Sequence, residues 1–412
     1  MPKQRVFYGW VNVALFFLIA QATWGPQYSF GVFFKPLVEE FGWTRAQTSG
    51  AMTLNLIVGG FLGFVAGVAA DRYGPRKVMW GVGIFIGAGY LMMSRLTTLW
   101  QLYLWFGLVA GIGVSAAYIV PASTISRWFV AKRGLGLGIA LMGMGFSQIL
   151  VPPVLANLIL NVGWRSTYAI IGGGVLAVVL LLASFLRKSP EDYGLGPDGI
   201  ERRTEQNTTE KAVAPDGLLL KQAIRLPALW LLCLLWVFIA LPGFLTVVHI
   251  VPLATDVNPG ISARTAALII SVIGLTGLTG RLFFGYASDR WGCKKTVVLC
   301  LVLMTVAMVE LMFARSLSSF IIAAIVFGAG FNGADTATIK MVGDFFGRRA
   351  IGAVMGLTGT GFRIGAASGA LIGGAVYDAT TSYQASFATA ALCSMIAVAL
   401  VFIIFRHKPH TA

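Results

Sequence analysis

Charge is scarce in this sequence. Only 11% of its 412 residues are Asp, Glu, Lys or Arg, whereas a soluble domain averages about 25%. A soluble protein of this length would therefore lack the polar surface that it needs. Short segments of alternating apolar and polar residues are also missing from the sequence, which argues against a membrane β-barrel.

Residues that bind metals or perform covalent chemistry are few as well. The four cysteines have neither the spacing of a metal site nor the pattern of a disulfide framework. No pairing of a nucleophile with a base, no cluster of metal ligands and no phosphate-binding loop rises above chance. The sequence therefore predicts no enzyme, no metal and no cofactor.

Long apolar runs take the place of these features. Spanning the hydrocarbon core takes about 20 helical residues, and twelve runs are long enough, four of them only if one charge is admitted. Because lipid cannot hydrogen-bond the backbone, each run is expected to be a helix. The prediction is an all-α membrane protein with transmembrane helices at residues 6–34, 46–70, 78–94, 96–126, 134–164, 166–186, 226–248, 265–288, 296–314, 316–339, 350–377 and 379–405.

The net charge of +15 comes mainly from Lys and Arg in the terminal segments and in every second loop. This distribution is the positive-inside bias, and it predicts that both termini are cytoplasmic. It indicates orientation rather than nucleic-acid binding. We expect a multi-pass protein of a bacterial-type inner membrane that contacts lipid and functions as a monomer.

A polar segment divides the spans into two sets of six. Between Arg187 and Arg225 the chain has too few apolar residues to fold by itself. The predicted domains are therefore a first half at 1–187, a cytoplasmic linker at 188–225 and a second half at 226–412.

The two halves repeat each other. The stretch "GVAADRYGPRK" (67–77) recurs as "GYASDRWGCKK" (285–295), each time after the second span of its half. Parallel six-helix repeats are typical of the major facilitator superfamily, and this turn resembles the signature loop of that superfamily. The resemblance implies interhelical charge clusters that latch the cytoplasmic side, with Asp71, Arg72, Asp289 and Arg290 as members.

Arg281 lies inside the eighth span, where charge is costly. An Arg at a helix centre costs about 2.5–3.5 kcal/mol on insertion scales, although its long stem could carry the charge towards the cytoplasmic end. A permanent cation facing a water-filled cavity would bind a carboxylate through two parallel hydrogen bonds. We predict that Arg281 binds a substrate carboxylate, with a salt bridge inside the bundle as the alternative.

Arg363 in the eleventh span is the second intramembrane cation. By the repeat it corresponds to Ser147, so it breaks the symmetry of the two halves. Either it lines the cavity or it pairs with Asp335, and we assign it a structural role.

A permanent cation cannot carry a proton, so a proton-coupled cycle needs a titratable group nearby. His249 is the one histidine outside the carboxyl tail, and histidine changes charge near neutral pH. Asp256 lies two helical turns further along the same face and is the second candidate. Its other interpretation is a solvated residue at the end of the span. Asp335 in the tenth span is the third candidate.

Uncharged side chains complete the predicted substrate site. Tyr28, Tyr118 and the pair Phe331 and Asn332 lie on spans one, four and ten, which line the central cavity in the superfamily, as does span seven with His249. Phenol hydroxyls there could donate to a carboxylate, and the rings offer apolar surface to a short carbon chain.

The whole chain resembles the monocarboxylate transporter family. The stretch "FYGWVNV" (7–13) matches its first motif except for a missing acidic residue, and "RWFVAKRGLGLGIALMGMGFS" (127–147) matches its second. The resemblance places the family's span-eight arginine on Arg281. Two residues implicated in proton coupling in the family are absent, because Tyr28 replaces a span-one lysine and Gly277 replaces an acidic residue.

The chain is also similar to the oxalate–formate antiporters. These share the span-eight arginine, and their second cation is a span-eleven lysine near the position of Arg363. The sequence predicts alternating-access symport of a proton with a small monocarboxylate such as lactate or pyruvate. Carboxylate exchange is the alternative within transport, and a membrane-embedded carboxylate sensor is the alternative outside it.

Overall fold

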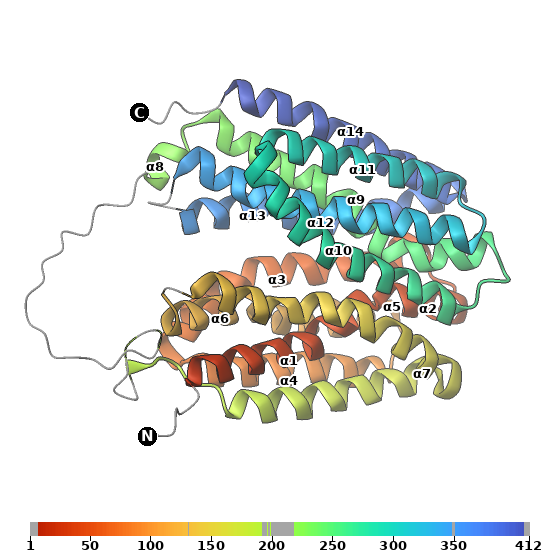
Figure 1. Ribbon diagram of the computed structural model, residues 1–412. Coiled ribbons are helices and arrows are strands. Elements are labelled where there is room, and N and C mark those ends of the chain that lie inside the picture. The colour runs from red at the N-terminus through yellow and green to blue at the C-terminus, as the bar shows by residue number, and fades with distance from the viewer. Residues whose placement is uncertain are drawn as a thin grey trace, which may run out of the picture. The chain divides into compact units, whose positions relative to one another are not determined.

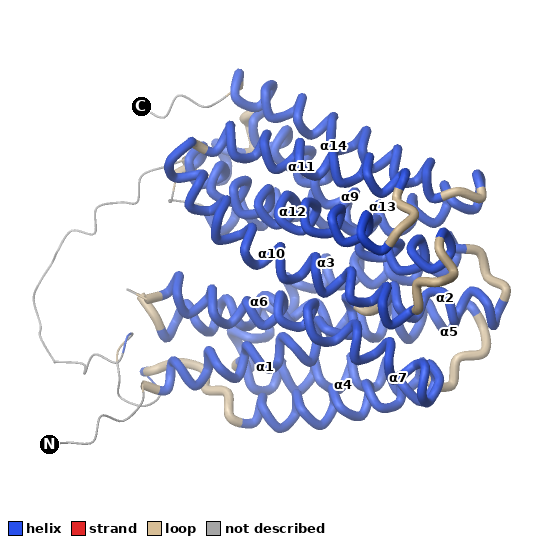
Figure 2. Tube along the Cα trace, turned by 45° about the vertical axis from the view of Figure 1, so that its right-hand side comes forward, coloured by secondary structure: helices blue, strands red, loops and turns tan. Residues whose placement is uncertain are grey.

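The regular elements of the computed structural model are helices joined by short turns (Figures 1 and 2). It describes residues 7–130, 132–191, 196, 198, 218–347 and 351–407, without the side chains of 64, 133, 134 and 351–353. Most of the linker predicted at 188–225 therefore lies outside the described residues.

Contacts divide the chain into two compact units. The first comprises Met1–Ser29 and Leu54–Glu210, and the second comprises Phe30–Thr53 and Lys211–Ala412. The sequence repeat assigned residues 30–53 to the first half, whereas in the structure they pack with the helices of the second unit. The domain limits taken from the repeat stay a prediction.

The first unit is built on a long broken helix. The helix α7 (Arg133–Ser184) packs against α1 (Tyr8–Tyr28) and α4 (Pro75–Met93), while α4 also contacts α6 (Gly111–Trp128). Two further elements, α5 (Leu99–Leu102) and the π-helix η1 (Tyr103–Ala110), run directly into α6. The part of α3 (Arg45–Tyr73) that follows Thr53 also belongs to this unit.

The second unit is built around a helix that is buried for most of its length, α9 (Pro227–Val257). Around it lie α10 (Ala263–Trp291), α12 (Leu317–Phe346), α13 (Ile351–Thr380) and α14 (Tyr383–Arg406), and α11 (Cys293–Phe313) packs on α12 and α14. The short α2 (Phe30–Phe41) and the first turns of α3 rest on this unit, and α8 (Leu220–Ala223) precedes α9.

A row of glycines lets α13 approach α9 closely. Gly361, Gly365 and Gly369 recur every four residues, and a Cβ on any of them would collide with a backbone carbonyl of α9. Helices in lipid gain no hydrophobic free energy by associating, so close van der Waals contact through small residues is what holds them together. This row fixes the α9–α13 register and thereby positions the residues that follow it.

The predicted all-α fold with twelve spans is confirmed. Seven described helices are long and apolar enough to cross a membrane, or eight if the two bent pieces of α3 are joined. The helix α7 has 52 residues and breaks at Gly163, so it supplies two spans. With α1 and α2 as one span, α5, η1 and α6 as another, and the four-residue α8 left aside, the described helices amount to twelve spans.

We predict that Gly163→Ala lowers the thermal unfolding midpoint of the purified protein in detergent. Gly163 has a φ of 79° and a ψ of 161°, a region that costs a residue with a Cβ about 1–3 kcal/mol. The matched control is Gly174→Ala in the same helix, where a Cβ also meets open space. That control should be neutral or slightly stabilising, by up to about 1 kcal/mol, and equal midpoints for the two variants would contradict the prediction.

Candidate functional site

Arg281 on α10 reaches two side chains of α12. Its Nε donates to Asn332 Oδ1 at 3.0 Å, and its Nη2 lies 3.3 Å from Asp335 Oδ2. The amide of Asn332 in turn donates to the carbonyl of Gly328 at 3.1 Å, which orients its oxygen towards the guanidinium. The salt bridge that the sequence left as the alternative is therefore present, and its acid is Asp335.

Two glycines of α10 make this contact possible. A Cβ on Gly280 would lie 2.7 Å from Ala329 Cα, and one on Gly277 would lie 2.9 Å from Asn332 Cγ. The two helices therefore approach closely at this level, and the Asn332 side chain occupies the space beside Gly277. A side chain at position 277 would displace Asn332 from the guanidinium.

The two charged partners differ in exposure. The Arg281 side chain is 48% exposed and that of Asp335 is 19% exposed. A guanidinium has five N–H donors, so Arg281 keeps donors beyond the two that these bonds use. The arrangement is a cation neutralised on one side by an acid and still able to bind an anion.

Aromatic rings form an apolar surface next to this pair in the chain. Phe331 stacks on Phe327 with ring centroids 5.5 Å apart, and its ring contacts Gly243 of α9. The next residue of α9, Phe244, lies edge-on to Phe362 of α13, with ring centroids 6.0 Å apart. Phe331 and Asn332 are thus in the second unit with Arg281, and Asn332 accepts a hydrogen bond from the arginine itself.

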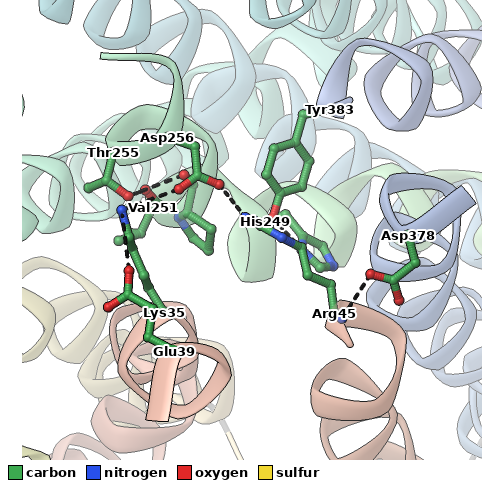
Figure 3. A network of polar contacts seen from close by, with 10 residues as sticks. Lys35, Glu39, Arg45, His249, Val251, Thr255, Asp256, Asp378 and Tyr383 are labelled. Atoms are coloured by element: carbon green, nitrogen blue, oxygen red, sulfur yellow. Dashed lines mark hydrogen bonds and ion pairs between the residues drawn. The ribbon is translucent and has the colours of Figure 1, made fainter. Parts of the chain in front are cut away.

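A second polar network lies near the C-terminal end of α9 (Figure 3). His249 is fully buried, with Nε2 at 2.9 Å from the Ala370 carbonyl and Nδ1 at 3.3 Å from the Tyr383 hydroxyl. The ring also lies edge-on to Phe34 of α2, 5.2 Å away. In the described residues no hydrogen bond or ion pair joins His249 to Arg281.

Arg45, the first residue of α3, is the centre of this network. Its guanidinium forms an ion pair with Asp256 and donates to the Tyr383 hydroxyl. It also lies over the Tyr377 ring, 3.8 Å from the centroid. The side chains of Arg45 and Asp256 are only 14% and 22% exposed, so Asp256 is not the solvated end residue of the alternative interpretation.

Asp378 of α13 caps the start of α3 from a different helix. Its two carboxylate oxygens accept from the backbone N–H groups of Arg45 at 2.9 Å and Ala46 at 2.7 Å. These are among the first-turn donors that a helix leaves without an intrahelical partner. On the other side of the network, Lys35 of α2 lies 3.3 Å from Asp256.

Each of the two repeated turns forms an interhelical ion pair. Asp71 on α3 pairs with Arg127 on α6 in the first unit, and Asp289 on α10 pairs with Lys340 on α12 in the second. The neighbouring predicted members, Arg72 and Arg290, each lie over a tyrosine ring of their own helix. The pairing partners Arg127 and Lys340 were not found from sequence, and a latching role for these turns stays a prediction.

The remaining predicted residues divide between the two units. Tyr28 ends α1 and Tyr118 lies half-exposed on α6, both in the first unit. Arg363 lies on α13 in the second unit, and the ion pair that the structure gives Asp335 is with Arg281. Among the described residues, no group of three or more His, Cys, Asp or Glu side chains is arranged to hold a metal ion.

The family model of the Major Facilitator Superfamily matches residues 13–258 and 250–412. The chain belongs to this superfamily. Monocarboxylate transporter 13 of Rattus norvegicus is 25% identical to it over 386 residues, covering 93% of this chain and 86% of the relative. The oxalate:formate antiporter of Oxalobacter formigenes is 25% identical over 288 residues, covering 70% of this chain and 65% of the relative.

A solved structure shows the same superfamily fold. The crystal structure of a bacterial homolog to the human lysosomal transporter Spinster superposes with a TM-score of 0.82, covering 98% of both chains at 15% identity. At this identity the likeness concerns the fold alone. The predicted resemblance to a superfamily of transporters with monocarboxylate and oxalate–formate members is thereby confirmed.

We predict that Asp378→Ala destabilises the second unit of this superfamily member by about 1 kcal/mol, the usual cost of losing a helix cap. The physical reason is the loss of the acceptor for two N–H groups at the start of α3. The thermal midpoint in detergent measures the effect. Glu39→Gln is the matched control, because Glu39 is 65% exposed and contacts only Lys35 at 3.8 Å; equal shifts for both would refute the capping role.

Proposed function

We propose that this protein carries a small monocarboxylate of the lactate and pyruvate class across the inner membrane together with a proton. Membership of the Major Facilitator Superfamily supports transport, and relatives named as monocarboxylate transporters and an oxalate:formate antiporter support small carboxylates as substrates. The observation that carries the proposal is the contact of Arg281 with Asn332 and Asp335 inside the helices of the second unit.

In this proposal the substrate carboxylate replaces Asp335 at the guanidinium of Arg281. Planar two-point recognition of a carboxylate is what arginine does better than lysine. Asn332 keeps the Nε side of the guanidinium occupied, so the substrate binds through the terminal nitrogens. The Phe331 ring offers apolar surface to the carbon chain, and Tyr28 and Tyr118 of the first unit are proposed donors to the substrate.

The proton goes to Asp335 in the same step. Once the substrate takes the guanidinium, Asp335 is a covered carboxylate without its cation, which is strongly unfavourable unless it becomes protonated. Of the three candidates from sequence, Asp335 forms an ion pair with Arg281, whereas His249 and Asp256 belong to the Arg45 network. Substrate and proton therefore bind together.

Reorientation of the two units around the loaded site completes the cycle. The positive-inside bias places the repeated turns on the cytoplasmic side, so the pairs Asp71–Arg127 and Asp289–Lys340 are proposed to stabilise the helix ends there. Exchange of two carboxylates is the second candidate, favoured by a second intramembrane cation, Arg363, and by the antiporter among the relatives.

Arg281→Ala should reduce uptake of labelled lactate into proteoliposomes by about tenfold to a hundredfold, the loss expected when hydrogen bonds to a charged group are removed. An inward proton gradient drives the uptake in this assay. Arg264→Ala, an exposed cation in the first turn of the same helix, is the control and should transport normally. Full uptake by correctly folded Arg281→Ala protein would overturn the assignment of Arg281.

Asp335→Asn should separate substrate binding from proton coupling. The amide cannot take a proton, so a proton gradient should no longer drive accumulation, while counterflow into vesicles preloaded with unlabelled lactate should continue. Glu310→Gln, an acid on α11 without a part in the site, is the control and should keep both activities. Gradient-driven accumulation by Asp335→Asn would show that the proton binds elsewhere. Wild-type uptake that requires preloading would favour exchange.

A further inference from the structure

We propose that Arg45 holds residues 30–53 against the second unit and so acts as the latch of an outer gate formed by this segment. We also propose that protonation of His249 releases this latch. The inference rests on the proposed function, because a gate has a role only in a transport cycle. Sequence analysis did not single out Arg45, Tyr383 or Asp378, and His249 was considered only as a carrier of the transported proton.

The latch holds a segment that connects the two units. The first piece of α3, Arg45–Gly63, is one continuous helix before the bend, but its residues up to Thr53 belong to the second unit and the rest to the first. Any motion of one unit against the other must therefore release residues 30–53 or strain this helix. The repeat, which assigns these residues to the first half, is consistent with release.

Close backbone contacts seat this segment on the second unit. A Cβ on Gly31 would lie 2.8 Å from the Val248 carbonyl of α9, and one on Gly374 of α13 would lie 2.7 Å from the Arg45 carbonyl carbon. Thr53 donates to the Ala367 carbonyl of α13 at 2.7 Å. These contacts are short-range and reversible, so a polar group that can switch is needed to decide between docked and released states.

Arg45 joins three helices of the second unit to α3. It pairs with Asp256 of α9, donates to Tyr383 of α14, and stacks on Tyr377 of α13. Its backbone N–H is held by Asp378. Breaking this set at one residue removes the contacts with all three helices together, which is what a latch requires.

The hydrogen bonds of His249 fix its protonation state in the latched form. The Ala370 carbonyl can only accept, so Nε2 carries a hydrogen and donates to it. In the neutral ring Nδ1 is then an acceptor, and the Tyr383 hydroxyl donates to it while its oxygen accepts from Arg45. In the latched form the Tyr383 hydroxyl therefore both donates one hydrogen bond and accepts another.

A second proton on His249 breaks this arrangement. Nδ1 would become a donor, the Tyr383 hydroxyl would lose its acceptor, and its oxygen would lie between two cations. The groups that face the ring are Tyr383 on α14, Asp378 and the Ala370 carbonyl on α13, Arg45 on α3 and Phe34 on α2, with Asp256 further along α9 itself. Asp256 pairs with Arg45 and Lys35, and Asp378 accepts from the backbone N–H groups of Arg45 and Ala46, so protonation adds positive charge beside a latch whose acids already have partners.

Protons can reach this network from one end of the unit. A cavity of about 260 Å³ is lined by Asp256, Tyr377 and Tyr383 together with Arg315 and residues at the start of α14. The positive-inside bias predicts that this end faces outwards. Acid outside would then release the latch, so the outward-open state would be favoured when protons for symport are abundant.

The first test measures how fast a thiol at position 49 reacts with a maleimide in nanodiscs, which expose both faces and make sidedness irrelevant. Ser49 is fully buried beside Gly374, so Ser49→Cys reports release of the segment. The four native cysteines are replaced beforehand. Adding Arg45→Ala should accelerate labelling about tenfold, within the usual range of coupling free energies. Glu39→Gln, which changes a 65% exposed acid of the same segment, is the control and should change it little.

Asp256→Asn provides a second variant that keeps the size of the side chain and should also accelerate labelling. An Arg45→Ala protein that elutes as a single folded species but labels no faster than its parent would overturn the latch. Because labelling requires no substrate, this result is independent of lactate uptake. If the wild-type protein takes up no lactate but the variants label as expected, only the proposed substrate is refuted.

The protonation part is tested by measuring labelling in steps from about pH 7.5 down to about pH 4, a range that extends well below the usual histidine titration. Each rate is divided by that of an exposed Gly260→Cys thiol, which corrects for the reagent's own pH dependence. Acid should accelerate the corrected Ser49→Cys rate several-fold, and His249→Gln should abolish this acceleration. Acceleration that persists in His249→Gln would assign the pH response to another group.

Discussion

The hydrocarbon core of a membrane offers no hydrogen-bond partner to a protein, and this constraint governs the structure. Backbone groups must be satisfied within each segment, so the spans are helices. Charged side chains within the helices need polar partners, and Arg45 and Arg281 of the second unit each pair with a carboxylate. Close helix packing then depends on small residues, and the row from Gly361 to Gly369 brings α13 onto the backbone of α9.

The sequence was sufficient for properties that depend on one segment at a time. The number of spans follows from run length, and the break of α7 coincides with the charged boundary predicted between residues 164 and 166. Arg281 could be singled out because a guanidinium within an apolar helix is conspicuous without any knowledge of its surroundings. The internal repeat predicted the superfamily fold because it is a comparison of the chain with itself.

Pairing could not be predicted, because it depends on how each helix is rotated about its axis. The sequence suggested Arg363 as a partner of Asp335 and named no acid for Arg281, whereas Asp335 contacts Arg281 because Gly277 and Gly280 let α12 approach α10. Asp256 lies at the end of α9, and its partner Arg45 is 211 residues away in the chain. The only sequence signal for Arg45 was its position: it is an isolated cation at the start of a span, in a loop on the predicted outer side, where Lys and Arg are few.

The charge carried by the site bears on the choice between symport and exchange. In the empty carrier the Arg281–Asp335 pair has no net charge, and a carrier loaded with one anion and one proton has none either. Both forms could therefore reorient without moving extra charge through the low-dielectric interior. An obligate exchanger needs an empty carrier that cannot reorient, for example because its binding cation lacks a carboxylate partner. Asp335 supplies that partner, so the pair supports a carrier that returns empty, as symport requires.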